Sequence, residues 1–347
     1  MSAGRGRGTQ ESSGRRKAAT LHAVAQLAGV STATVSKALN GIAVSPDNLA
    51  RVLAAADELG YVPNEAARSI RGGPTMTVGI VIHFDLHPRF ELMAIVDRTI
   101  RVMEAQGYSV FLSVSGGSAE VDTLLRRYAE RRVDGLIFWN AENAPSLDLY
   151  RRGGVPVLAV GFRDPRWCDL PTVRVDSTEA YRNLYRKMKR LGHRRIHEID
   201  PGQAAPTHQS TAAEFGIEWQ PLATSFGPDA VRRTIESLAS RGTPLALLAP
   251  YPVTLDIFTA CDELGLDIPN DVTIVASTDS AGAELLRTPV TAIRTDWERI
   301  GEASAEALLG ALAGHPLDDV LVPDCVEFMD RASIGPGRRR RAAAARS

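Results

Sequence analysis

The sequence contains only three cysteines in 347 residues, at positions 168, 261 and 325. Cysteines that are odd in number and far apart provide neither a disulfide framework nor a C-x-x-C metal site, and they are typical of a reducing cytoplasm. No apolar run approaches the ~18 residues that a membrane span requires. Residues 1–17 also lack the apolar centre of a secretory signal. We therefore expect a cytoplasmic protein without a membrane partner.

Sequence patterns that would indicate catalysis or metal binding are also missing. There is no G-x-S-x-G nucleophile elbow and no paired-carboxylate arrangement for acid–base chemistry. The stretch SGGSAE (Ser115–Glu120) could cradle a phosphate, but it lacks the lysine of a phosphate-binding loop, which favours a plain strand-to-helix loop. His83, Asp85 and His87 alternate along a strand without a fourth ligand at a recognisable spacing. We expect no catalytic residue, no metal site and no cofactor.

The net charge of −1 hides an uneven distribution of charge. Residues 1–72 contain nine Lys and Arg against five acidic residues, which gives +4 there and −5 over the remainder. A basic front on an acidic body is typical of a polyanion-binding module joined to a domain for a neutral ligand. The alternative, an effect of an unstructured tail, remains open because part of this charge lies in residues 1–19. These are rich in Gly, Ser and Arg and are expected to form a disordered basic arm.

Three short helices are expected between residues 20 and 63. TLHAVAQLAG stops at Gly29, and STATVSKALN begins with Ser31 as a favourable N-cap. SPDNLARVLAAADELG has Ser45 at the N-cap and Pro46 at the first helical position. Three helices in so short a segment, the first two joined by a glycine turn, predict a helix-turn-helix module. The next stretch, VPNEAARSIRGGPT, predicts a linker too short to be a stable helix alone, which would fold only on binding.

The middle helix of this module has an unusual open face. In GVSTATVSKALNG, Val35, Ala38 and Leu39 lie on one side, and small hydroxyl side chains with one lysine lie on the other. An exposed helix usually carries Glu, Lys and Arg there. Either this face is pressed against a polar partner, or it is an ordinary helix with a poor choice of surface residues.

Strand-like and helical patterns alternate from residue 75 onward. Buried parallel strands with crossover helices form doubly wound α/β sheets, two of which fit this length and would hold a small molecule between them. The expected strands are Thr77–Ile82, Ser109–Val114, Gly135–Trp139, Val155–Val160, Arg195–Ile199, Leu245–Ala249 and Val272–Ala276. The expected helices include Leu92–Gln106, Val121–Arg132, Ser177–Leu191, Asp229–Ser240 and Thr254–Leu264.

Several stretches resemble the LacI/GalR family of bacterial transcription regulators. TLHAVAQLAGVSTATVSKALNG and LAAADELGYVPNEAARSIR are similar to its headpiece, third helix and hinge. ERRVDGLIF, GGVPVLAV, VRVDSTEAYRNL, LGHRRI and ELGLDIPNDVTIVA are similar to its effector-binding domain, which itself resembles periplasmic sugar-binding proteins. The resemblance runs from about residue 20 to residue 333. It implies an α/β protein with a three-helix headpiece, a hinge helix and a two-subdomain, periplasmic-binding-protein-like body.

The resemblance also implies the domain boundaries. These are a disordered arm (1–19), the helix-turn-helix domain (20–63), the hinge helix or linker (64–74), the effector-binding and dimerisation domain (75–333) and a disordered basic tail (334–347). Within that domain, the N-subdomain is expected at about 75–175 plus 294–318. The C-subdomain is expected at about 176–293 plus 319–333.

The function implied is that of a ligand-responsive repressor of a carbohydrate or related metabolic operon, binding a palindromic operator as a homodimer. The recognition helices would enter the major grooves, and the paired hinge helices would enter the central minor groove. Two alternatives stay open. One is a regulator whose ligand is atypical or absent. The other is a solute-binding protein, against which the headpiece and the missing signal argue. An enzyme is the least expected class.

Entry into a groove explains the small hydroxyls, because the leading residues must let the helix backbone approach the bases. Ser31, Thr34 and Ser36 would donate to phosphates beside the helix N-terminus. The resemblance assigns base reading to Thr32, Ala33 and Lys37, a phosphate contact to Asn40, and a minor-groove wedge flanked by two arginines to Ile70. The expected DNA-binding set is Leu21, Ser31, Thr32, Ala33, Thr34, Ser36, Lys37, Asn40, Asn64, Ala67, Arg68, Ile70 and Arg71.

The effector region departs from the family pattern. Tyr251 or Pro252 stands where sugar-binding members commonly have an acid. In place of GFDD the chain has STDS, with Thr278 at the first acid and Asp279 at the second. An arginine of an RxxGF element is missing as well. Each sugar hydroxyl left unpaired costs roughly 1–3 kcal/mol, so we expect a less hydroxylated effector or none. Candidate lining residues, whose aromatics could equally be core, are Phe84, Asp85, Arg89, Phe90, Trp139, Asn140, Phe162, Arg163, Tyr251, Thr278 and Asp279.

Overall fold

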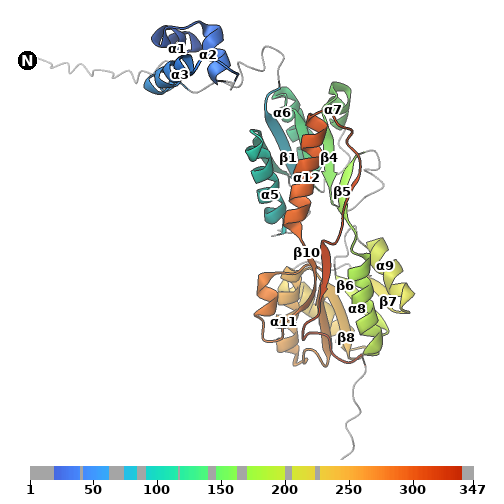
Figure 1. The fold of residues 1–347 in the computed structure, drawn as a ribbon. Coiled ribbons are helices and arrows are strands. Elements are labelled where there is room, and N and C mark those ends of the chain that lie inside the picture. Colours follow the sequence, from blue (N-terminus) through green and yellow to red (C-terminus); the bar gives the residue numbers. More distant parts are fainter. Residues whose placement is uncertain are drawn as a thin grey trace, which may run out of the picture. The chain divides into compact units, whose positions relative to one another are not determined.

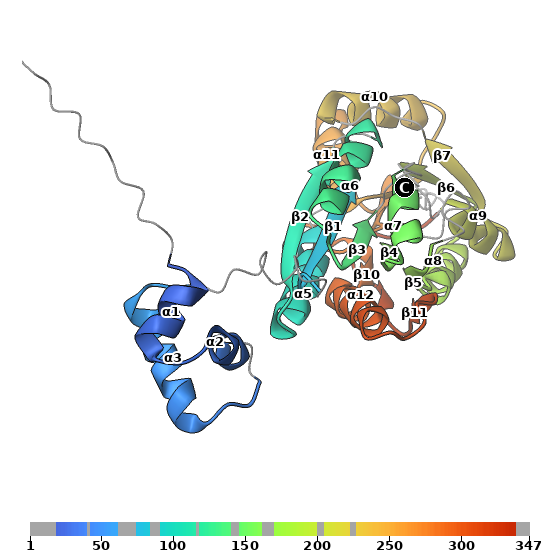
Figure 2. The same ribbon diagram turned by 90° about the horizontal axis from the view of Figure 1, so that it is seen from above.

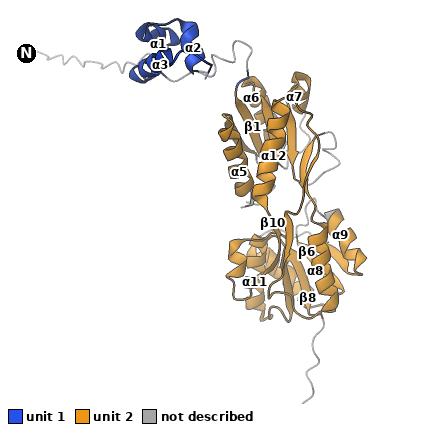
Figure 3. Cartoon of the chain, in the orientation of Figure 1, with its two compact units in different colours: residues 1–75 blue, residues 76–347 orange. Residues whose placement is uncertain are grey.

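The chain forms two compact units, residues 1–75 and 76–347 (Figure 3). The computed structural model describes residues 19–39, 42–61, 74–83, 91–115, 118–139, 146–161, 170–199, 205–222 and 227–337. Each unit has its own apolar core. In the described ranges, no helix has both the length and the apolar character needed to cross a membrane.

The first unit is a bundle of three helices, α1 (Leu21–Ala28), α2 (Thr32–Leu39) and α3 (Pro46–Glu58). The Thr20 hydroxyl accepts a hydrogen bond from the backbone N–H of Ala23 at 3.2 Å and caps α1. α1 ends at Gly29, whose φ of 61° is left-handed and suits glycine. Ser45 occupies the expected N-cap position of α3, although its side chain makes no capping bond. The core consists of Val24, Ala25, Ala28, Val35, Ala38, Val52, Ala55 and Ala56.

The first sheet of the second unit is parallel, in the order β11-β5-β4-β3-β1-β2. Its strands are β1 (Thr77–His83), β2 (Ser109–Ser115), β3 (Gly135–Trp139), β4 (Val157–Val160), β5 (Thr172–Val175) and β11 (Val320–Val322). One face packs against two long helices and the other against two shorter ones (Figure 2). These are α5 (Glu91–Ala105) and α12 (Trp297–Leu312) on one side, and α6 (Ser118–Glu130) and α7 (Leu147–Gly153) on the other.

The second sheet has the order β12-β10-β9-β8-β6-β7 and is parallel except for β12 (Figure 1). Its strands are β6 (Arg195–Ile199), β7 (Glu218–Leu222), β8 (Leu245–Ala249), β9 (Val272–Ala276), β10 (Thr291–Thr295) and β12 (Val326–Met329). Two helices pack on each face. They are α8 (Thr178–Arg190) with α9 (Ala205–Glu214), and α10 (Pro228–Ala239) with α11 (Tyr251–Leu264). A short 3-10 turn, η3, spans Ala281–Glu284.

The described chain passes between the two sheets at three places, after β5, after β10 and after β11. The crossings lie side by side. Val175 of β5 is in register with Val322 of β11, and the backbone N–H of Asp296 donates to the carbonyl of Cys325 at 2.7 Å. The expected boundary at residues 318 and 319 is corrected here, because β11 pairs with β5 in the first sheet. A three-residue strand has too few residues for its pattern to show which sheet it joins.

Candidate nucleic-acid interface and effector region

The hydroxyls that open α2 bond to each other and to the backbone. The Ser31 Oγ accepts a hydrogen bond from the backbone N–H of Thr34 at 3.1 Å and lies 2.9 Å from the Thr34 Oγ1. Ser31 is therefore the N-cap that the sequence predicts. Only one of the two hydroxyl hydrogens is used in the contact between them, which leaves the other available to an acceptor such as a phosphate.

The two sides of α2 differ in the way expected from the sequence. Val35 is fully buried and Ala38 is 6% exposed, which fixes the inner side of α2 against the core of the unit. Thr32, Ala33 and Lys37 are exposed on the outer side. Leu21 packs against the edge of the apolar core. The other predicted DNA-binding residues, Asn40, Asn64, Ala67, Arg68, Ile70 and Arg71, lie outside the described residues.

The charge around this face favours an anionic partner. The segment from Leu21 to Leu39 contains no Asp or Glu, and Lys37 is its only lysine. The unpaired backbone N–H groups at the start of a helix carry partial positive charge, which adds to that of the lysine. Small side chains, a positive helix end and one long cationic side chain are suited to close contact with a phosphate-lined groove.

Two tryptophans meet at the carboxyl end of the first sheet. Trp139 is the last residue of β3, and Trp297 is the first residue of α12, directly after a crossing. Their rings stack edge to face, with centroids 6.4 Å apart and planes at 67°. Trp139 is one of the predicted lining residues, whereas Trp297 was not predicted. Asp296 caps α12, because its side chain accepts a hydrogen bond from the backbone N–H of Arg299 at 3.1 Å. An aromatic residue directly after such a cap was the sequence signal that could have indicated Trp297.

Two predicted residues meet at the carboxyl end of the second sheet. The backbone N–H of Tyr251, which begins α11, donates to the Thr278 Oγ1 at 3.2 Å. The Tyr251 hydroxyl approaches Gly282 so closely that a Cβ there would lie 2.4 Å from it. Parallel α/β sheets bind ligands at this end of their strands. Tyr251, Thr278 and the Trp139–Trp297 pair all follow strands at that end.

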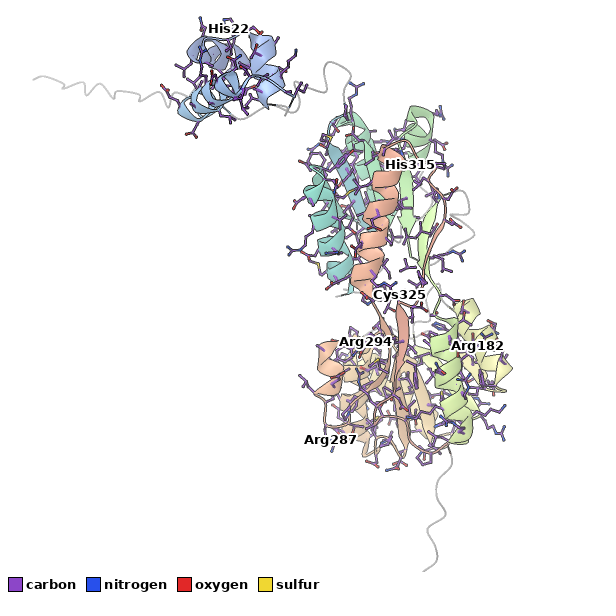
Figure 4. The ribbon with its side chains drawn as sticks, in the orientation of Figure 1. His22, Arg182, Arg287, Arg294, His315 and Cys325 are labelled. Atoms are coloured by element: carbon purple, nitrogen blue, oxygen red, sulfur yellow. The ribbon has the colours of Figure 1, made fainter. Side chains whose placement is uncertain are left out.

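Asp279 lies next to Thr278, but both of its carboxylate oxygens are occupied. Arg331 donates to them at 2.7 and 2.8 Å, and Arg294 donates to Oδ2 at 2.8 Å. The Asp279 side chain is 5% exposed and that of Arg331 is 9% exposed. Glu284 accepts from both arginines and completes the cluster. Figure 4 labels Arg294 where β10 approaches the crossing.

The electrostatics of the cluster follow from this geometry. Burial alone would raise the pKa of Asp279, but the hydrogen bonds and charges of Arg331 and Arg294 outweigh it and lower that pKa. The hydrogen bonds to Asp279 and Glu284 raise the pKa of Arg331. Asp279 is therefore a carboxylate held by arginines, and its expected contact with ligand hydroxyls stays a prediction. Asp85, Arg89, Phe90, Asn140, Phe162 and Arg163, together with Phe84, lie outside the described residues.

Known proteins resemble the chain along most of its length. Residues 20–64 match a domain described as bacterial regulatory proteins, lacI family. Residues 75–215 match the periplasmic binding proteins and sugar binding domain of LacI family, and residues 172–334 match a periplasmic binding protein-like domain. The transcriptional repressor PurR of Erwinia tasmaniensis is 26% identical over 337 residues, which cover 92% of this chain and 98% of PurR.

Solved structures agree with the fold described above. The lac repressor dimer bound to operator and to the anti-inducer ONPF has a TM-score of 0.76 at 22% identity, covering 91% of this chain and 99% of the repressor. The complex of the regulator CelR with cellobiose has a TM-score of 0.63 at 25% identity, covering 91% and 99%. Both the helical unit and the two-sheet body therefore have counterparts of known architecture.

Proposed function

The chain belongs to the lacI family of bacterial regulatory proteins and is a DNA-binding transcription regulator, not an enzyme. From that premise we propose that it acts as a dimeric repressor whose operator affinity is set by a small effector. The observation that carries the proposal is α2, a capped helix whose exposed side holds Thr32, Ala33 and Lys37 and no acid. The body attached to it has the two-sheet architecture that takes small ligands.

On the DNA side, we assign base reading to Thr32, Ala33 and Lys37. The lysine would contact guanine O6 and N7, and the Ala33 methyl would contact the thymine methyl. The free hydroxyl hydrogen of the Ser31–Thr34 pair would go to a phosphate. We also include the hinge residues, with Ile70 as the minor-groove wedge, among the DNA contacts. This assignment rests on the family resemblance alone.

Selection of binding sites from a pool of random duplexes tests this function. We expect the enriched sites to be inverted repeats, because a dimer with two recognition helices reads two half-sites related by a two-fold axis. Footprinting on the enriched duplex should protect both half-sites together. Enrichment of a single unpaired half-site, or of no sequence at all, would contradict the proposal.

For the effector, we propose a ring compound with fewer hydroxyls than a disaccharide. The Trp139–Trp297 pair offers apolar ring surface, and Thr278 offers a hydroxyl. Asp279, the acid closest in sequence, is already paired with two arginines. CelR binds cellobiose, so this sugar is the reference ligand in a calorimetric panel of sugars, sugar phosphates, nucleobases and lactones.

Trp297→Ala should weaken binding of the selected effector about tenfold or more, because an aromatic contact with a ring is lost. Trp297→Phe should retain most of the affinity. His315→Ala, three residues beyond the last residue of α12, serves as the control. Calorimetry measures the affinity of each variant for the effector. A gel shift without effector verifies that each variant still binds the operator. Tight binding of cellobiose that Trp297→Ala does not change would contradict this site and this ligand class.

A second candidate is a regulator that works without an effector. The engagement of Asp279 with Arg331 and Arg294 favours it, since both oxygens of that carboxylate already accept hydrogen bonds from the fold itself. A gel shift with and without a cell metabolite extract separates the two candidates. Release of the operator by the extract supports the effector-controlled repressor, and unchanged retention supports the second candidate.

The dimer has a candidate interface in exposed apolar side chains. Leu112 (44% exposed) and Val114 (50%) lie on the edge strand β2, and Met93 (66%) lies on α5. In the C-subdomain, Leu255 (39%) lies on α11 and Leu285 (86%) follows η3. Apolar surface of this kind commonly marks a protein interface. We assign the homodimer contact to these residues.

The double variant Leu112→Asp/Val114→Asp should be monomeric by analytical ultracentrifugation. It should also bind the palindromic operator about 100-fold more weakly, because the two headpieces no longer bind as one bivalent unit. The matched control is Leu321→Asp, a change of the same kind at 48% exposure on β11, the opposite edge of the same sheet. A dimeric double variant, or a monomeric control, would contradict the assignment.

A further inference from the structure

One arginine joins α3 to the turn between α1 and α2. The Arg51 Nη2 donates a hydrogen bond to the carbonyl of Gly29 at 3.3 Å, across 22 residues of sequence. The same nitrogen occupies the space that a side chain on Gly29 would need, because a Cβ built there would overlap it. Glycine at position 29 therefore serves two needs, the left-handed φ of 61° and the close approach of Arg51.

This contact is distinctive because an ordinary partner for Arg51 is available on its own helix. Asp47 lies four residues before it on α3. At the same spacing on α5, Asp97 and Arg101 form an ion pair at 2.7 Å. Arg51 instead bonds to the backbone of the turn, and within the described ranges no carboxylate pairs with it. The fold directs this guanidinium to the turn and not to a neighbouring acid.

The turn that Arg51 contacts leads directly into α2. The backbone N–H of Val30 donates to the carbonyl of Ala25 at 3.1 Å, which fixes the turn to α1. The bond from Arg51 to Gly29 fixes the same turn to α3. Because α2 begins at Thr32, three residues after Gly29, these two contacts determine where its first turn lies.

The first turn of α2 depends on such contacts because its core packing lies further along the helix. Val35 and Ala38 are buried and Leu39 packs against the core, all within the last five residues of α2. The helix has eight residues and is about 12 Å long at 1.5 Å per residue. A tilt of about 10° about its middle moves its first residue by about 1 Å, whereas a binding constellation tolerates only about 0.5 Å.

We propose that Arg51 is a positioning residue for operator recognition, which holds the turn so that α2 presents Thr32 and Ala33 to the edges of the bases. This inference rests on the base reading proposed above for α2. Binding to random DNA depends on phosphates and not on base edges. Removal of Arg51 should therefore lower the affinity for the operator and leave the affinity for random DNA largely unchanged.

The test compares the full-length wild type with Arg51→Met on the selected operator and on a random duplex, by fluorescence anisotropy at a series of salt concentrations. Operator binding should weaken about tenfold, because misplaced base contacts lose discrimination at both half-sites. Binding to the random duplex should weaken by no more than about threefold. The salt slope on the operator should equal that of wild type, since no phosphate contact is lost.

The matched control is Glu58→Gln, which changes the charge of an exposed side chain in the last turn of the same helix. It should keep the wild-type ratio of operator affinity to random-duplex affinity. Hydrogen exchange of the full chain verifies the fold of each variant. In Arg51→Met, the amides of α1 and α3 should stay protected as in wild type, while those at the start of α2 should exchange faster.

A second variant approaches the same contact from the turn. Gly29→Ala places a Cβ where the Arg51 Nη2 lies, so it displaces the guanidinium as well as straining the backbone. The double variant Gly29→Ala/Arg51→Met should have about the same affinity ratio as Gly29→Ala alone, because both changes break one contact.

The inference is overturned if Arg51→Met keeps the wild-type affinity ratio, or if the losses of Gly29→Ala and Arg51→Met multiply in the double variant. It is also overturned if both duplexes bind more weakly to the same extent and the salt slope falls by about 0.9, the result expected for a phosphate contact. Failure of the proposed function is recognised separately, because wild type itself would then not distinguish the operator from the random duplex.

Discussion

Replacing Lys37 by alanine is expected to weaken operator binding by about 10- to 100-fold while binding to random duplex DNA changes by no more than about threefold. One good contact to a guanine edge is worth about 1–3 kcal/mol of discrimination, and Lys37 is the only lysine on the exposed side of α2. Its backbone lies in a helix fixed by the fully buried Val35, so the substitution should leave the fold intact. Fluorescence anisotropy on both duplexes at one fixed salt concentration gives the two affinities.

Lys17→Ala removes the same charge from the same unit outside the three helices and should affect the operator and random duplex equally. Lys37→Arg should keep most of the operator affinity, because arginine also contacts guanine O6 and N7. Equal losses on both duplexes for Lys37→Ala would show that Lys37 contacts phosphate only and that the base-reading assignment is wrong.

Replacing Arg331 by methionine is expected to destabilise the body by about 3 kcal/mol, the lower end of the cost of removing one partner from a buried ion pair. Asp279 would keep only Arg294, whose side chain is 44% exposed. Urea unfolding followed by circular dichroism measures the loss. Asp279→Asn/Arg331→Met should recover part of it, because the unpaired carboxylate is then removed as well.

The control for this variant is Arg287→Met. It breaks an ion pair to Asp262 in which both side chains are mostly exposed, and should change stability by less than about 0.5 kcal/mol.

The pH dependence of stability provides a further check on the Asp279–Arg331 pair. The pKa of Asp279 is lowered in the folded protein, so its stabilising contribution is complete above the unfolded value of about 3.9 and is lost as pH falls through the lower folded value. The gap between wild type and Arg331→Met should therefore narrow only in acid below pH about 4.

Local patterns predicted much of the fold. The strands Gly135–Trp139, Arg195–Ile199, Leu245–Ala249 and Val272–Ala276 have the predicted bounds, because a buried parallel strand is a short unbroken apolar run. The edge strand β7 was missed, since EWQPL lacks such a run and contains proline. The three residues of β11 were assigned to the wrong subdomain, because pairing with β5 depends on residues far away in the sequence.

The same division holds for the candidate sites. Ser31 and the inner side of α2 followed from capping and helical spacing, which depend on neighbours three or four residues away. The partners of Asp279 did not, because Arg294 and Arg331 are 15 and 52 residues away along the chain. Only the folded arrangement of β10, η3 and the segment after β12 brings these charges together.

The three adjacent crossings have a mechanical consequence. Arg299 Nη1 donates to the carbonyl of Asp324 at 2.9 Å, which ties the second crossing to the third, and β5 ties the first to the third through β11. Because the three connections are joined side by side, they form a hinge that bends easily about one axis and resists twisting about the others. The body should therefore have one soft mode in which the two subdomains open and close, so that very different ligands would drive the same motion.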